Sequence, residues 1–288
     1  MAETTLRSRS RTVTIGPGHP VAVIGERLNP TGRRVLSQEL ARGEMRLVRR
    51  EALAQAEAGA ALLDVNVGLP GADQARLMRA VVEALQETTD LPLCLDSADA
   101  GVLDAGLGAY GGRALVNSVT GEEHALAEVL PVVQAHGAAV IALPMDDSGI
   151  PDTAEGRLRV AERILERAAL VGIAAEDVVI DPLTMAVGAD SASARVTLDT
   201  ISLLHRHLGL NVTLGVSNVS HGLPARTALN ATFVAMALAL GATCPILNPL
   251  EAGMMQAVRA ANLCLGYDDW ASGWIRAFRA ARRSGGEA

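Results

Sequence analysis

The chain has 288 residues, of which 49% are hydrophobic, and a formal net charge of −7. It contains no lysine, so all 25 basic residues are arginine, which excludes Schiff-base chemistry and any phosphate-binding loop built on lysine. Aromatic residues make up only 2%, and this scarcity, together with the acidic balance, argues against binding to single-stranded or duplex nucleic acid.

The N-terminal residues carry several arginines with no apolar stretch after them. We therefore predict neither a secretory signal nor a membrane-spanning segment, and a cytoplasmic location. Cys94, Cys244 and Cys264 form no close pair, so neither a disulfide framework nor a zinc site of thiolates is expected. Since no linker-like stretch divides the chain, we expect a flexible tail over residues 1–19 and a single domain over residues 20–288.

Eight short apolar runs, each bounded by turn residues or polar residues, are predicted to be strands. In chain order they span residues 21–25, 61–67, 91–96, 114–118, 138–143, 178–181, 211–217 and 244–247. The clearest segments with helical spacing span residues 38–58, 72–87, 122–136, 154–171, 192–207 and 225–240. A glycine follows five of these at the position of a helix C-cap, namely Gly59, Gly137, Gly172, Gly209 and Gly241.

Alternation of strands and helices decides the fold class. The strands are nearly continuous in apolar residues, as expected for strands that are buried on both faces. Eight of them alternating with helices at this length predict an α/β fold, a (β/α)8 TIM barrel, with an open doubly wound sheet as the alternative.

Polar residues gather at the carboxyl ends of the predicted strands, where a barrel places its active site. They include Glu26, Asp64, Asn66, Asp96, Asn117, Asp181, Ser217, Asn218 and Asn248. Carboxylates beside amides suit a flat heterocycle with an amino-pyrimidinone edge, because Asp accepts two parallel N–H bonds and Asn both donates and accepts. For Asp64 and Asn66 a purely structural role is an equal alternative. No histidine or cysteine lies at these strand ends, so we expect no bound metal.

Six motifs at these strand ends occur in order along the chain. They read GERLN at residues 25–29, LDVNVG at 63–68, CLDS at 94–97, VNS at 116–118, IDPL at 180–183 and LGVSNVS at 214–220. Together they resemble the pterin-binding methyltransferases that use methyltetrahydrofolate and a corrinoid protein, and the similar folate-binding domain of cobalamin-dependent methionine synthase. The resemblance covers roughly residues 21–280.

This resemblance implies a TIM barrel of the pterin-binding type that moves a methyl group between N5 of tetrahydrofolate and a corrinoid. By similarity, Asp96, Asn117 and Asp181 bind the pterin ring, and Asn218 lies near N5. We assign catalysis to Asn218 and Asp181, because a hydrogen bond to N5 that strengthens as the C–N bond breaks lowers the barrier.

The remaining expected substrate contacts also come from this ring and the loop after it. They are Glu26, Asn66, Ser217 and Arg226. By the resemblance, Arg226 and Asn230 match family positions just after the seventh strand, where they support that loop or the folate. Tetrahydrofolate or 5-methyltetrahydrofolate is the expected substrate. The chain has no Asp-x-His-x-x-Gly motif, so the cobalamin is expected on a separate corrinoid protein. The resemblance also implies a homodimer.

Two alternatives remain open. Dihydropteroate synthase shares the pterin barrel, but that family uses a lysine after the seventh strand, where this lysine-free chain reads Ser217-Asn218-Val219-Ser220. The other alternative is a non-catalytic pterin-binding subunit, against which the intact polar ring argues.

Two further patterns lie outside the ring. Four arginines fall around one predicted helix and are interpreted as a solvated face: Arg157, Arg159, Arg163 and Arg167. Trp270, Trp274 and Phe278 are four residues apart, which predicts one face of a C-terminal helix that packs on the barrel or forms a dimer or partner surface. Charge on a folate tail or a corrinoid partner would have to be met by Arg27, Arg33, Arg34 or Arg226.

Overall fold

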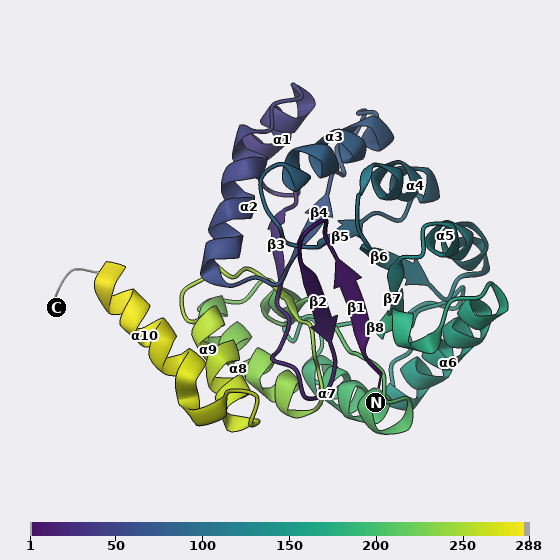
Figure 1. The fold of residues 1–288 in the computed structure, drawn as a ribbon. Coiled ribbons are helices and arrows are strands. Elements are labelled where there is room, and N and C mark those ends of the chain that lie inside the picture. Colours follow the sequence, from purple (N-terminus) through teal and green to yellow (C-terminus); the bar gives the residue numbers. More distant parts are fainter. Residues whose placement is uncertain (1, 285–288) are drawn as a thin grey trace.

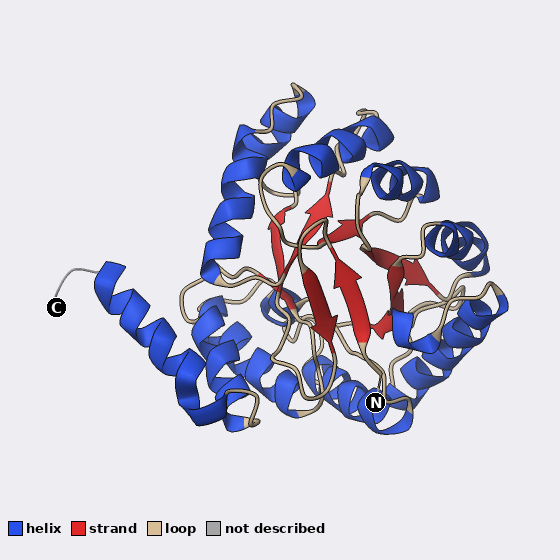
Figure 2. Ribbon diagram, in the orientation of Figure 1, coloured by secondary structure: helices blue, strands red, loops and turns tan. Residues whose placement is uncertain are grey.

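Parallel strands alternate with helices in the computed structural model, which describes residues 2–284 (Figure 1). The strands of the main sheet are β3 Ile24–Leu28, β4 Leu62–Asn66, β5 Leu93–Asp96, β6 Leu115–Thr120, β7 Ala139–Leu143, β8 Val178–Ile180 and β9 Ile246–Leu247. The helices are α1 Arg34–Ala41, α2 Arg46–Ala58, α3 Gln74–Gln86, α4 Ala100–Ala109, α5 Glu123–Ala135, α6 Ala154–Leu170, α7 Ser193–His207, α8 Arg226–Ala239, α9 Met254–Cys264 and α10 Ser272–Ser284. Figure 2 shows the strands as a curled inner sheet with helices around it.

The sheet runs β8-β7-β6-β5-β4-β3-β9, and every pairing in it is parallel. Residues 211–215, within the seventh predicted strand, make single bridges to β8 and to Ile246 instead of a continuous ladder. Ile180 N donates to Asn211 O at 2.9 Å, and Ile246 N donates to Leu214 O at 2.9 Å. This segment therefore joins the two edge strands and closes the barrel, although it is too irregular to count as a strand.

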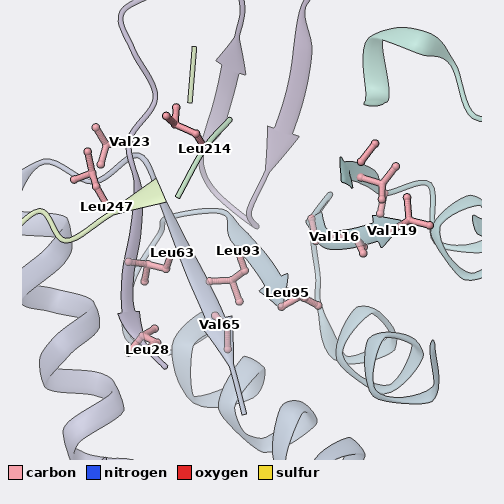
Figure 3. Packing of buried hydrophobic residues seen from close by; sticks show 14 of the residues in the cluster. Val23, Leu28, Leu63, Val65, Leu93, Leu95, Val116, Val119, Leu214 and Leu247 are labelled. Atoms are coloured by element: carbon pink, nitrogen blue, oxygen red, sulfur yellow. The ribbon is translucent and has the colours of Figure 1, made fainter. Parts of the chain in front are cut away.

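Side chains along each strand alternate between two apolar layers. One layer lies between the strands and the helices, and Figure 3 shows part of it, including Leu63, Val65 and Leu95. The second layer is a smaller cluster formed by the residues of opposite parity, among them Ile24, Leu62, Cys94, Leu115, Val179 and Ile246. This second cluster fills the inside of the barrel.

The N-terminal residues differ from the expected flexible tail. β1 Thr4–Arg7 and β2 Thr12–Ile15 form an antiparallel hairpin, which lies in front of the ring of strands in Figure 1. Leu6 and Ile15 are 0% and 1% exposed and belong to the cluster inside the barrel. Asn211 Nδ2 donates to Ile15 O at 2.9 Å. The hairpin therefore plugs one end of the barrel, because its apolar side chains are buried there.

The helix predicted over residues 38–58 is two helices, α1 and α2. The chain turns at Gly43, where φ is +72°. The buried Glu39 then caps α2: its Oε2 accepts from Leu47 N at 2.8 Å, and its other oxygen pairs with Arg46. All five glycines predicted to end helices have positive φ, which confirms that part of the prediction.

Two helices, α4 and α9, lie where we identified no clear helical segment. α4 contains three glycines, which obscure its helical pattern. Asp99 starts it by accepting from Gly101 N and Val102 N at 2.8 and 3.0 Å. A Cβ on Gly106 would lie 2.7 Å from Met78 Cγ, so the missing side chain lets α4 pack closely on α3.

The predicted C-terminal aromatic face is wrong for Trp270. Asp268 accepts from Gly273 N and Trp274 N, both at 2.8 Å, so α10 begins at Ser272. Trp274 and Phe278 lie in this helix, whereas Trp270 precedes it with a φ of +57° and is 97% exposed. None of the helices within residues 2–284 combines the length and the apolar character needed to cross a bilayer.

Candidate functional site

A polar cavity of about 630 Å³ opens where the carboxyl ends of the strands converge. Its walls come from almost every strand and from the loop before α8. The lining residues are Glu26, Arg27, Asn29, Thr31, Arg33, Asp64, Asp96, Asn117, Asp181, Gly215, Asn218, Arg226, Ile246 and Asn248.

The alternation of strand side chains explains why these groups meet. Every strand of the main sheet except β7 places an apolar side chain inside the barrel and a polar one two residues later, on the same face. The successive pairs are Ile24 and Glu26, Leu62 and Asp64, Cys94 and Asp96, Leu115 and Asn117, Val179 and Asp181, and Ile246 and Asn248. The apolar cluster inside the barrel and the polar cavity are therefore two successive levels of one barrel interior.

Two carboxylates inside the barrel hold two amides in fixed orientations. Asn117 Nδ2 donates to Asp64 Oδ1 at 3.0 Å. Asn66 Nδ2 donates to Asp96 Oδ2 at 2.9 Å, while Asn66 Oδ1 accepts from Gly68 N at 2.8 Å. Since both amide nitrogens are engaged, Asn117 Oδ1 and Asp96 Oδ1 are left as acceptors for a ligand in the cavity.

Asp181 follows β8 directly, in a loop whose backbone carbonyls accept hydrogen bonds from a buried arginine. Its Oδ1 accepts from Leu183 N at 2.8 Å. Arg157 donates to Pro182 O at 2.6 Å and to Leu183 O at 2.8 Å, and is only 3% exposed. The interpretation of Arg157 as part of a solvated face is therefore wrong, because it shares the buried stripe of α6 with Val160 and Ile164.

The loop after the closing segment carries Asn218. It forms a 3-10 turn, Val216–Ser220, which leaves the Asn218 side chain exposed at the cavity wall. Arg226 holds this turn: Nη2 donates to Ser217 O at 2.7 Å and Nε donates to Ser220 Oγ at 2.9 Å. Ser217 thus contributes a backbone carbonyl to the support of the loop.

Burial raises the pKa of all four acidic groups in the cavity. For Glu26, burial and the nearby Glu251 raise the pKa to about 7, against the opposing effects of Arg226 and Arg27. For Asp181, burial raises the pKa to about 6, partly offset by the Leu183 N–H and Arg157.

The other two groups, Asp64 and Asp96, are neighbours. Burial raises the pKa of both, and the charge of Asp96 adds to the effect on Asp64. A cavity with this many buried carboxyls favours their protonated forms or a ligand that donates N–H groups.

The cavity brings together six of the eight side chains predicted to bind substrate: Glu26, Asp96, Asn117, Asp181, Asn218 and Arg226. Asn66 and Ser217 do not line it, and they contact it through Asp96 and Arg226 instead. Asn230 is 2% exposed within α8 and does not line it either. Among the arginines considered for a folate tail or partner, Arg27 and Arg33 line the cavity and pair with Glu51, whereas Arg34 does not line it.

Asn29, Thr31 and Asn248 line the cavity without having been predicted to bind substrate. Asp64 and Arg157 also contribute to the site, and sequence reasoning assigned neither of them to substrate binding. The alternation that identifies Asp96 also applies to Asp64, so its inward direction was predictable, but its bond to Asn117 was not. The spacing of Arg157 from Val160 and Ile164 was the available signal for its burial. Within residues 2–284, no group of three or more His, Cys, Asp or Glu side chains is arranged to hold a metal ion.

Comparison with known proteins identifies relatives in sequence and in fold. Residues 25–248 match a family described as "Pterin binding enzyme". Methylcorrinoid:tetrahydrofolate methyltransferase of Eubacterium limosum is 29% identical over 263 residues, which cover 89% of this chain and 96% of that protein. Methionine synthase of Mycobacterium tuberculosis is 35% identical over 227 residues, which cover 74% of this chain but only 19% of that longer protein.

Solved structures share the fold. Dihydropteroate synthase of Yersinia pestis with a pterine-sulfa conjugate superposes with a TM-score of 0.70 at 22% identity, covering 91% of this chain and 99% of that one. The Xanthomonas albilineans dihydropteroate synthase with 7,8-dihydropteroate gives 0.68 at 20% identity, covering 91% and 98%. The family match spans most of the chain and reaches every strand of the main sheet. The chain therefore belongs to the family of pterin-binding enzymes.

Proposed function

We propose that this protein is a methyltransferase that moves a methyl group between N5 of tetrahydrofolate and the cobalt of a corrinoid held by a separate protein. One observation carries the proposal: the barrel ends in a cavity in which hydrogen bonds hold the acceptor oxygens of Asp96, Asn117 and Asp181 at the wall. The Eubacterium limosum relative, a methylcorrinoid:tetrahydrofolate methyltransferase that is similar over almost its full length, supports the same substrates.

The amino-pyrimidinone edge of a pterin matches those acceptors. It presents several N–H donors in one plane, and carboxylate and amide oxygens fixed at the cavity wall can accept them together. A ligand bound in this way donates to Asp96 and Asp181, which have no ion pair within residues 2–284, so binding relieves part of the electrostatic cost of burying these carboxylates.

Asn218 would act at the other end of the pterin ring. The bond from N5 to a methyl group is hard to break because the nitrogen must take the electron pair. A hydrogen bond from the Asn218 amide that strengthens as charge develops on N5 would lower that barrier, while the wall carboxylates hold the ring in place. The corrinoid supplies the cobalt that accepts or gives the methyl group.

The rest of the proposal concerns assembly and location. A separate corrinoid protein must reach the open end of the cavity, and a homodimer is the arrangement that the family resemblance implies. We propose that residues 20–288 form one domain, and that the hairpin of β1 and β2 closes one end of its barrel. A reducing, cytoplasmic location is supported by three free cysteines, Cys94, Cys244 and Cys264.

A dihydropteroate synthase-like activity is the main rival. The Yersinia pestis and Xanthomonas albilineans structures are dihydropteroate synthases, but their identities to this chain, 22% and 20%, support the fold alone. The loop after the closing segment reads Ser217-Asn218-Val219-Ser220, and no lysine is present anywhere in the chain. This composition favours methyl transfer over the synthase.

Single-turnover methyl transfer tests the proposal. The protein is mixed with 5-methyltetrahydrofolate and free cob(I)alamin, or with tetrahydrofolate and methylcobalamin, and the corrinoid spectrum is followed. We expect transfer by the wild type and a rate lower by about 10²–10⁴-fold for Asn218→Ala. Reduced-folate binding without transfer in either direction would favour the non-catalytic binding subunit, and near-wild-type turnover by Asn218→Ala would remove Asn218 from the mechanism.

A further inference from the structure

Glu26 faces the cavity from β3, beside an irregularity in that strand. β3 pairs Gly25 with Leu63 and Leu28 with Val65, so three steps on β3 oppose two on β4. Such a bulge re-aims the side chains of the extra residue and its neighbour, and bulges are common beside active sites. Glu26 keeps the inward direction of Ile24, two residues before it, whereas Leu28, beyond the bulge, packs in the layer between strands and helices.

The residues around Glu26 fix the bulge in place. Arg27 N donates to Gln55 Oε1 at 3.0 Å instead of to a neighbouring strand. A Cβ at position 25 would lie 2.4 Å from that same Gln55 oxygen, so Gly25 is required for the contact. The Arg27 side chain is tied to Glu51 at 3.1 Å.

The barrel register places Glu26 on the same side of the cavity as Asn218. β3 pairs with β9 through Gly25 and Leu247, and β9 is bridged in turn to the closing segment through Ile246 and Gly215. Asn218 follows three residues after Gly215. Asp96 and Asn117 lie on β5 and β6, farther along the sheet from this junction.

Glu26 differs from the other cavity carboxyls in its contacts. Asp64, Asp96 and Asp181 each accept an N–H hydrogen bond. Within residues 2–284, the carboxyl of Glu26 has neither a hydrogen bond nor an ion pair.

Charged groups of both signs face Glu26 from the surrounding elements. Glu251 follows β9, Arg226 begins α8, Arg27 is on its own strand and Asp64 is on β4. Burial, with the charge of Glu251, raises the pKa of Glu26 to about 7. Both protonation states are therefore populated near neutral pH.

We propose that Glu26 is the catalytic acid and base that exchanges the proton of N5 during methyl transfer. The inference rests on the proposed function. When the methyl group leaves N5, the C–N electron pair stays on the nitrogen, which takes the proton of the Glu26 carboxyl. When N5 of tetrahydrofolate accepts a methyl group, the N5 proton passes to the Glu26 carboxylate. Proton and electron pair balance in both directions.

Other groups in the cavity are less suited to this step. The Asn218 amide can donate a hydrogen bond but cannot give up a proton at neutral pH. Asp64 is 4% exposed and already bonded to Asn117, and Asp96 and Asp181 belong to the wall proposed to hold the pyrimidine edge. Only Glu26 among these carboxyls both lacks a hydrogen-bond partner within residues 2–284 and lies on the side of the cavity where Asn218 is.

The test compares wild type with Glu26→Gln, which keeps the shape and the hydrogen-bonding capacity but removes the proton exchange. Single-turnover rates are measured from pH 5.5 to 8.5 in both directions, with free cob(I)alamin or methylcobalamin as the methyl carrier. For the wild type, transfer from methyltetrahydrofolate should slow as the pH rises through about 7, and the reverse transfer should become faster. For Glu26→Gln, both rates should fall by about 10²–10⁴-fold, and neither should change as the pH rises through about 7.

Glu251→Gln provides the electrostatic comparison. This substitution removes a negative charge that favours protonated Glu26. The midpoint of the change in rate with pH should therefore lie at lower pH than in the wild type. Calorimetry should give Glu26→Gln an affinity for methyltetrahydrofolate within a few-fold of wild type.

Three outcomes would overturn the assignment. They are Glu26→Gln rates within about threefold of wild type, an unchanged pH profile in that variant, or a loss of folate affinity that accounts for the whole loss of rate. The absence of any transfer by the wild type would instead count against the proposed function.

Discussion

Asp64 shows how one buried residue sets the chemistry of a cavity it barely reaches. It is 4% exposed and accepts the Asn117 amide nitrogen at 3.0 Å. An asparagine side chain presents either an oxygen or an amino group when it flips, and this bond selects the oxygen for the ligand side. Asp64 therefore determines which hydrogen-bonding pattern the cavity accepts.

Replacing Asp64 by leucine should weaken binding of a reduced folate by about tenfold or more, because an unpaired buried amide costs about 1–3 kcal/mol and is free to flip. Calorimetry with methyltetrahydrofolate measures this effect. Asp64→Asn is the matched control and should retain most of the affinity, since its oxygen can still accept from Asn117. Thermal unfolding checks that both variants fold, and equal affinities in two folded variants would contradict the role of Asp64.

At the scale of elements, the sequence predicts the inner strands well and the N-terminal hairpin not at all. Continuous apolar runs such as residues 138–143 belong to strands buried on both faces, and the structure places β7 there. The two hairpin strands have four residues each, and only a few of their side chains are buried. Their burial depends on an open barrel end to fill, which is a tertiary feature that local pattern does not contain.

The hairpin should contribute directly to stability through Leu6. This side chain is fully buried, so Leu6→Ala should lower the free energy of unfolding by about 2–5 kcal/mol. Thr5→Ala, at the exposed neighbouring position, should change it by no more than about 0.5 kcal/mol. Urea unfolding measures both variants. If Leu6→Ala were as stable as Thr5→Ala, the hairpin would not be part of the folded core.

At the scale of the whole molecule, the buried carboxyls should make the ligand-free protein less stable at higher pH. Their pKa values are raised in the folded state, to about 7 for Glu26 and about 6 for Asp181. Between pH 5 and 8 the folded chain therefore binds more protons at these groups than the unfolded chain, and the free energy of unfolding falls as pH rises.

Thermal unfolding of the ligand-free protein should accordingly give a Tm a few degrees lower at pH 8 than at pH 5.5. Glu26→Gln should flatten this dependence, because one of the titrating groups is removed. A Tm that rises over the same interval in wild type would mean that these carboxyls do not govern the stability of the empty site.

The candidate site was predictable to the extent that it follows from strand alternation. Glu26, Asp96, Asn117 and Asp181 each lie where a barrel strand ends, and the cavity contains all four. Which side chains line the cavity and which support them was not predictable, because this depends on hydrogen-bond partners from other strands. Asn66 lies on the same strand as Asp64, yet it supports Asp96 from outside the cavity lining.

The central claim is that the acceptor-lined cavity holds the pterin of a reduced folate. Calorimetric titration of the wild type and of Asn117→Ala with 5-methyltetrahydrofolate tests it most directly. We predict saturable binding at one site per chain by the wild type and a loss of about tenfold or more in Asn117→Ala, which removes a wall acceptor. No binding by the wild type at millimolar ligand, or equal binding by the two proteins, would contradict the account.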